Sequence, residues 1–272
     1  MAVLDRTVIA GDGVRLAAGV TGDDAAPPFL LIPGLGATAT VFDPIVPALA
    51  RHYRTLLYDP RGVGGSEPGS APLTMELMAS DAVSVMQQLD APRAHVLGAS
   101  MGGTVAQYVA VLTPSHVERL VLAATSPGGQ KAIPADPRAT NALLGRGGRT
   151  PEEAYRIACT VLYSPRFQRA HPEFIDEQVR QRAARPVRPR VFAAQMAALA
   201  AVGAVTDRLR EIRMPCLVAH GTADAVTPVE NARLLASLIP GARTRWFDDC
   251  GHLFFHERPD ESARVVHEFL RD

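Results

Sequence analysis

Short apolar runs that alternate with helical segments constrain the fold of this chain most strongly. Four segments are predicted strands, at residues 29–32, 55–58, 94–97 and 117–124, and 29–32 is a continuous apolar run. Segments with the apolar spacing of helices separate them, at residues 41–50, 74–89 and 101–112. A β-rich pair at 3–9 and 14–20 precedes them and flanks the hairpin signal Gly11-Asp12-Gly13. Because fully apolar strands are buried on both faces, we predict a mostly parallel sheet covered by helices on both sides.

The middle of the chain interrupts this alternation. Residues 126–205 contain helical pieces, such as 151–163 and 191–202, but no buried strand signal. The alternation resumes with strands at 216–220 and 244–247 and helices at 228–239 and 259–270. We therefore predict one core built from residues 1–125 and 206–272, and a helical cap insertion over residues 126–205.

Composition excludes several classes of protein. The 28 Lys and Arg residues balance the 28 Asp and Glu residues, so no net field attracts nucleic acid or an anionic membrane. No stretch approaches the ~20 apolar residues of a membrane-spanning helix, and residues 1–13 lack the apolar run of a secretory signal. Cys159, Cys216 and Cys250 form neither a disulfide framework nor a metal motif. We expect a soluble cytoplasmic protein without nucleic-acid or membrane partners.

The pentapeptide Gly98-Ala99-Ser100-Met101-Gly102 has the pattern GxSxG. A predicted strand leads directly into it and a predicted helix leads directly out. A tight strand-to-helix turn needs small neighbours, which Gly98 and Gly102 supply. Such a turn raises the Ser100 hydroxyl above the carboxyl ends of the strands, where open α/β sheets bind ligands. Ser100 is therefore predicted to be a nucleophile.

A serine hydroxyl needs a base to remove its proton, and the base needs an acid to orient it. His252 follows the last predicted strand, and Asp224 follows the strand at 216–220, so both are expected on carboxyl-end loops. Asp248 and Asp249 are too close in sequence to His252 to be obvious orienting partners. His220 is interpreted as structural, and Cys250 as a small buried residue rather than a thiol nucleophile.

Acyl transfer also requires two donors for the oxyanion. We predict the backbone N–H of Met101 as one donor. The loop Pro33-Gly34-Leu35-Gly36, which follows the strand at 29–32, supplies the N–H of Leu35 as the other. An ordinary glycine-rich turn is the alternative interpretation of this loop, and the motif alone does not decide between them.

These motifs resemble the α/β-hydrolase superfamily over essentially the whole chain. The segment at 58–66 is similar to the D-x-R-G-x-G-x-S loop of its esterase and lactonase branch, which includes carboxylesterases, 3-oxoadipate enol-lactonases and aclacinomycin-type methylesterases. The resemblance implies an α/β-hydrolase fold, with an eight-stranded, mostly parallel sheet and a helical cap. It also implies structural roles for Asp59 and Arg61. Pro33 departs from the His that many relatives carry there, which leaves the geometry of the oxyanion loop open.

The activity implied is that of a carboxylic ester hydrolase, an esterase or lactonase with a catalytic triad of Ser100, Asp224 and His252. It requires no metal or organic cofactor. Its partner is a small, mainly hydrophobic ester or lactone that forms an acyl-enzyme on Ser100. Residues expected around this substrate are Gly34, Ile157, Val161, Phe192 and Met196, although the four cap residues could equally pack the cap onto the core.

Two other classes of function stay open, and so does the oligomeric state. One is a lyase, a cyclase or a perhydrolase that uses the same triad. The other is a ligand receptor of this fold with slow turnover. A homodimer is compatible with the sequence. The insertion also carries Arg180, Arg182, Arg185, Arg188 and Arg190, which we interpret as a solvated face, with a clamp for a substrate carboxylate as the alternative.

Overall fold

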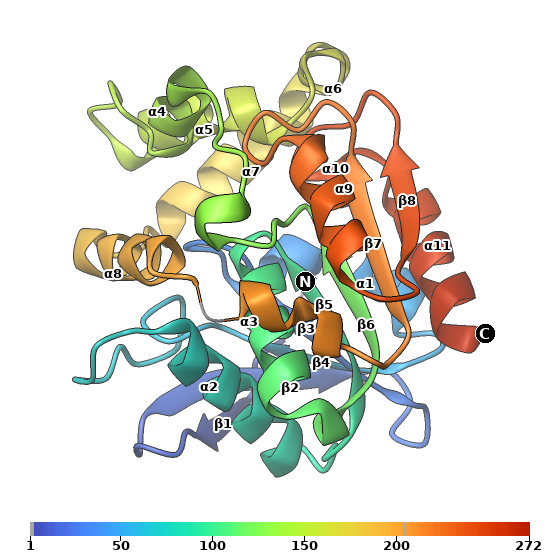
Figure 1. Ribbon diagram of the computed structural model, residues 1–272. Coiled ribbons are helices and arrows are strands. Elements are labelled where there is room, and N and C mark those ends of the chain that lie inside the picture. The colour runs from blue at the N-terminus through green and yellow to red at the C-terminus, as the bar shows by residue number, and fades with distance from the viewer. Residues whose placement is uncertain (1–2, 204) are drawn as a thin grey trace.

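The strands of the chain form one sheet at the centre of the molecule (Figure 1). The structure is a computed structural model that describes residues 3–203 and 205–272, so residues 1–2 and residue 204 of the predicted insertion lie outside it. The strands are β1 (Arg6–Ile9), β2 (Arg15–Thr21), β3 (Pro28–Ile32), β4 (Arg54–Tyr58), β5 (Ala94–Ala99), β6 (Val117–Ala123), β7 (Cys216–Gly221) and β8 (Arg243–Phe247). Their order is β1-β2-β4-β3-β5-β6-β7-β8. The two pairs that contain β2 are antiparallel and all other pairs are parallel, which confirms the predicted eight-stranded, mostly parallel sheet.

Alternate residues of the central strands enter two separate hydrophobic clusters, because side chains along a strand point to opposite faces. In β3, for example, Leu30 and Ile32 belong to one cluster, whereas Phe29 and Leu31 belong to the other. The first cluster includes apolar residues of α2 (Met75–Gln88), α3 (Met101–Leu112) and α9 (Val229–Leu238). The second includes apolar residues of α1 (Val46–Leu49) and α11 (Pro259–Arg271). Helices therefore cover both faces of the sheet, as predicted.

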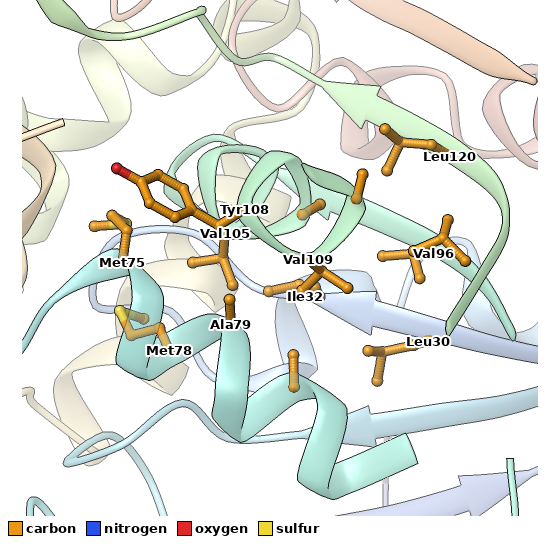
Figure 2. Packing of buried hydrophobic residues seen from close by; sticks show 14 of the residues in the cluster. Leu30, Ile32, Met75, Met78, Ala79, Val96, Val105, Tyr108, Val109 and Leu120 are labelled. Atoms are coloured by element: carbon orange, nitrogen blue, oxygen red, sulfur yellow. The ribbon is translucent and has the colours of Figure 1, made fainter. Parts of the chain in front are cut away.

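Helices α2 and α3 pack on each other and on the strands in the first cluster. Figure 2 shows Met75, Met78 and Ala79 of α2 directed towards α3, whose Val105 and Val109 lie near the strand residues. Helix α2 begins after Thr74, whose Oγ1 accepts a hydrogen bond from the N–H of Leu77 at 3.1 Å and so caps the helix. This packing fixes the first turn of α3, which follows Ser100.

The helix predicted over residues 41–50 is wrong in its extent. The structure has a 3₁₀ turn, η1 (Ala39–Phe42), followed by the short helix α1. Pro44 lies between them, and because its nitrogen carries no hydrogen it cannot donate the bond that a continuous helix requires. One further short helix, α10 (Phe254–Glu257), follows His252 and was not predicted.

Five α-helices lie between β6 and β7 in the described part of the chain, and we call them the cap helices. They are α4 (Pro137–Leu143), α5 (Pro151–Leu162), α6 (Pro165–Ala170), α7 (Pro172–Ala184) and α8 (Pro189–Ala200). Figure 1 shows α4, α5, α6 and α7 gathered together beside the sheet. Each begins with a proline, which is well tolerated there because an N–H in the first turn has no acceptor inside the helix. The boundaries of the insertion at residues 126 and 205 stay predictions.

The 3₁₀ turns η2 (Pro114–His116), η3 (Gly129–Lys131) and η4 (Thr206–Glu211) complete the elements. Within the described residues, no helix combines the length and the apolar character needed to cross a bilayer.

Candidate active site

The turn between β5 and α3 holds Ser100 in a strained backbone conformation. Ser100 has φ 56° and ψ −121°, a region that non-glycine residues rarely adopt. A side chain on Gly98 would collide with the backbone of Gly102, and one on Gly102 would collide with the carbonyl of Ile32. The two glycines therefore allow the turn that the GxSxG pattern predicted. The Ser100 N–H donates to the carbonyl oxygen of Ala123 at 2.9 Å, and the Ser100 carbonyl accepts from Thr125 Oγ1 at 2.8 Å, so the end of β6 and the loop after it hold the strained residue.

Asp224 and His252 form a buried pair on the loops after β7 and β8. His252 Nδ1 donates to Asp224 Oδ2 at 2.7 Å, and the two side chains are 4% and 0% exposed. Asp224 Oδ1 accepts the backbone N–H groups of Val226 and Thr227, each at 2.8 Å. Because Nδ1 carries the proton, the other ring nitrogen of His252 is left as an acceptor, which is the tautomer a general base needs.

His220 is a second histidine donor to the same carboxylate, a role that the sequence interpretation missed. Its Nε2 lies 3.0 Å from Asp224 Oδ2 and 2.8 Å from the carbonyl oxygen of Thr227, so it must carry the hydrogen. Burial would raise the pKa of Asp224, but His252 and His220 outweigh burial and hold that pKa well below its ordinary value. Asp224 is therefore a stable anion. The only sequence signal is the position of His220 at the end of β7, four residues before Asp224.

Glu257 in α10 connects the His252 loop to the cap helices. Its Oε1 accepts the N–H of Gly251 at 2.9 Å and the N–H of Ser164 at 2.7 Å, while Oε2 accepts Ser164 Oγ at 2.6 Å. Ser164 caps α6, and the N–H of Leu253 donates to Leu162 in α5 at 3.0 Å. Both neighbours of His252 in the chain are thus connected to the junction between α5 and α6, Gly251 through Glu257 and Leu253 directly. Nothing in the sequence analysis indicated this connection.

The loop at residues 33–36, which we call the oxyanion loop after its predicted role, lies against the strained turn. A Cβ on Gly34 would stand 3.1 Å from the Cβ of Ser100 and 3.6 Å from its Oγ, so the backbone approaches Ser100 as closely as glycine permits. Leu35 is the next residue, and Met101 is the first residue of α3, where an N–H has no acceptor inside the helix. Both predicted donors therefore belong to backbone segments that border Ser100.

The D-x-R-G-x-G-x-S segment braces this loop, as the resemblance implied. Asp59 accepts the N–H of Ala39, just after the oxyanion loop, and the N–H of Gly65, both at 2.9 Å. Arg61 is 1% exposed and pairs with Asp81 at 2.6 Å and with Asp12 at 2.7 Å. These contacts tie the ends of β1, β3 and β4 to α2.

The predicted substrate residues of the cap have different surroundings. The Phe192 ring lies 3.1 Å from the position of a Cβ on Gly36, so it borders the oxyanion loop. Ile157 instead lines a cavity of about 420 Å³ together with Gly147 and Thr160. Val161 and Met196 are half-buried on α5 and α8.

Other candidate groups have different roles. A second cavity, of about 320 Å³, lies between residues 62–68 and 185–188, and its lining does not include Ser100, Asp224 or His252. Among the described residues, no three His, Cys, Asp or Glu side chains are grouped as a metal site. Cys250 is 2% exposed, and burial raises the pKa of its thiol to about 11, so its interpretation as a small buried residue is confirmed.

The fold and this site define the class of protein. Residues 27–259 match the sequence profile of the alpha/beta hydrolase fold family, so the chain belongs to this family of hydrolases.

Three known proteins show how similar individual members are. A poly(3-hydroxyalkanoate) depolymerase of Ectopseudomonas oleovorans is 31% identical over 247 residues, which cover 90% of this chain and 84% of the depolymerase. The crystal structure of the enol-lactonase from Burkholderia xenovorans LB400 matches with a TM-score of 0.85 at 26% identity, and the match covers 98% of this chain and 100% of the enol-lactonase chain. A thermophilic esterase from Thermogutta terrifontis has a TM-score of 0.82 at 29% identity, with 98% and 97% coverage.

Proposed function

We propose that this chain is a carboxylic ester hydrolase, an esterase or lactonase that forms an acyl-enzyme on Ser100. One observation carries the proposal: the buried Asp224–His252 pair, joined at 2.7 Å, lies at the same sheet edge as the strained turn of Ser100. A lactonase and an esterase among the similar structures support the choice of ester chemistry within the family. The partly buried Phe192 beside the oxyanion loop supports a small, mainly hydrophobic substrate.

In the proposed mechanism, Ser100 Oγ attacks the carbonyl carbon while His252 Nε2 takes its proton. The N–H groups of Leu35 and Met101 donate to the oxygen that becomes negative. His252 then protonates the leaving alkoxide, and the acyl group stays on Ser100. A water molecule, deprotonated by His252, releases the acid and restores the hydroxyl. Asp224 remains ionised throughout and stabilises the imidazolium.

The direct test is Ser100→Ala, assayed with a p-nitrophenyl ester of short acyl length that the wild type cleaves. Loss of a triad member leaves only the oxyanion donors and substrate binding, so we expect activity to fall by ~10³-fold or more. Full activity in Ser100→Ala would refute the assignment.

Isotope analysis separates hydrolysis from the other chemistries that this triad supports. Hydrolysis in ¹⁸O-water places one solvent oxygen in the acid product. A product without that label would indicate a lyase or cyclase reaction. Covalent labelling by a fluorophosphonate with negligible turnover on a broad ester panel would indicate a receptor. We also propose a cytoplasmic location, which the three free, buried cysteines support.

A further inference from the structure

Arg182 differs from the other arginines of the cap because it reaches the oxyanion loop. It belongs to α7 and is only partly exposed. Its Nη2 lies 2.9 Å from the position that a Cβ on Gly36 would occupy. Gly36 is two residues from Gly34, a span of at most about 7 Å of extended chain. The guanidinium therefore lies near the place where a substrate carbonyl would meet Ser100.

Arg182 has no acidic partner within the described part of the chain. The aromatic ring of Tyr155, 5.8 Å from its guanidinium carbon, is the contact that the structure provides. Burial lowers the pKa of Arg182, and only Tyr155 opposes that effect. By contrast, Arg180 pairs with Glu177 at 2.7 Å on the exposed side of the same helix. A guanidinium stays charged in proteins, so a partly buried one without a counter-charge has an unfavourable electrostatic environment that an anion would relieve.

Gln195 supplies a second unpaired donor beside Gly36. Its Oε1 accepts the N–H of Gly36 at 2.7 Å, which fixes the orientation of the amide. The Nε2 group of that amide has no acceptor among the described protein groups, although the side chain is 0% exposed. An unsatisfied buried donor is uncommon in native proteins and needs an explanation. Arg182 in α7 and Gln195 in α8, whose donors have no acceptor among the described protein groups, therefore both lie beside Gly36.

We propose that Arg182 and Gln195 bind a carboxylate on the substrate. This inference rests on the proposed ester hydrolysis and narrows it to small esters or lactones that carry a free carboxylate a few carbon atoms from the scissile carbonyl. The planar fork of a guanidinium matches a carboxylate, and the amide of Gln195 adds a donor beside it. Phe192, whose ring borders the same position beside Gly36 as Arg182 Nη2, contacts the apolar part of the same molecule. The solvated-face interpretation then holds for Arg180 but not for Arg182.

The experiment compares monoethyl esters of succinate, glutarate and adipate with their neutral diethyl esters. Product formation is measured by chromatography, and the readout is the ratio of kcat/KM for the anionic ester to that for its neutral counterpart. A charged hydrogen bond contributes enough for about a ten- to hundredfold effect. We expect Arg182→Gln to lower this ratio by that factor for at least one chain length and to leave the neutral ester within about threefold of the wild type. Arg180→Gln is the matched control and should leave the ratio unchanged, while Arg182→Lys should restore part of it.

Equal losses on both esters in Arg182→Gln, or no preference for the anionic ester in the wild type, would overturn the proposal, because Arg182 would then only pack on Tyr155. A second measurement does not depend on turnover. Titration calorimetry should show that the Ser100→Ala protein binds monomethyl glutarate with higher affinity than dimethyl glutarate. Adding Arg182→Gln should abolish that difference in affinity. If no ester is cleaved but this preference is found, the proposed function fails and the carboxylate site stands. If esters are cleaved but the anionic ester is not preferred, the proposed function stands and the carboxylate site fails.

Discussion

Replacement of Asp224 by Asn exchanges one acceptor of the buried carboxylate for an NH₂ donor. Oδ1 must stay an acceptor because two backbone N–H groups donate to it at 2.8 Å. The new NH₂ group would then face His252 Nδ1 and His220 Nε2, which both carry hydrogens in the wild type. His252 can avoid this conflict by moving its proton to Nε2, the nitrogen that must accept the proton of Ser100. His220 cannot, because the carbonyl oxygen of Thr227 holds its Nε2–H at 2.8 Å.

The expected magnitude follows from these two conflicts. The wrong tautomer of a triad histidine costs ~10⁴-fold in kcat, which is about 5.5 kcal/mol of activation free energy. The donor–donor contact at His220 leaves a buried donor unpaired, which costs about 1–3 kcal/mol of unfolding free energy. We therefore expect Asp224→Asn to be folded, less stable and nearly inactive.

Stability should also depend on pH in a defined direction. The folded pKa of Asp224 is lowered, so the carboxylate stabilises the fold fully above the unfolded pKa of ~3.9 and loses this effect as pH falls towards the folded pKa. The stability gap between wild type and Asp224→Asn should be constant from neutral pH to about pH 5 and narrow below ~3.9.

The assays are ester hydrolysis and urea unfolding across this pH range. Adding His220→Phe to Asp224→Asn removes one of the two conflicting donors, so it should recover part of the stability but none of the activity. Activity of Asp224→Asn within tenfold of the wild type would refute the tautomer argument. A double variant that is no more stable than Asp224→Asn would refute the role assigned to His220.

Two further changes test the framework around the site. Glu257→Leu leaves the N–H groups of Gly251 and Ser164 unpaired, so we expect a loss of about 1–3 kcal/mol of unfolding free energy for each group, and a lower kcat. Glu257→Gln should keep most of the stability and most of the kcat. Equal kcat values in the two variants would argue against a connection between the Glu257 hydrogen bonds and the position of His252. Arg61→Met leaves Asp81, 3% exposed, as an uncompensated buried charge, so urea unfolding should show a loss of about 3–5 kcal/mol. A loss below 1 kcal/mol would show that the Arg61 network contributes little.

The sheet and the nucleophile turn were predictable because local patterns determine them. The run at 29–32 is short and ends in Pro33-Gly34, which favours a buried strand over a helix. The small residues that the tight turn requires, Gly98 and Gly102, are part of the pentapeptide itself. The helix at 41–50 failed because Pro44 breaks a pattern that apolar spacing alone would continue. Asp224 and His252 could be placed on carboxyl-end loops because they lie four and five residues after predicted strands.

The rest of the site could not be read from the sequence because it depends on how the cap helices dock. Arg182 and Gln195 lie 13 positions apart on different helices, and only their packing brings both to Gly36. The same holds for Glu257 and Ser164, which come from opposite sides of the cap boundary. His220 lies inside a local motif, but its apolar neighbours in β7 gave the same pattern that a packing histidine would give.

The central claim is that ester cleavage proceeds through an acyl group on Ser100. Rapid acid quench of the enzyme during turnover of an activated ester, followed by intact mass measurement and peptide mapping, tests it directly. We predict a mass increase equal to the acyl group on the peptide that contains Ser100, with no such adduct in Ser100→Ala. Turnover with the acyl group on another residue, or an active Ser100→Ala protein, would contradict the account.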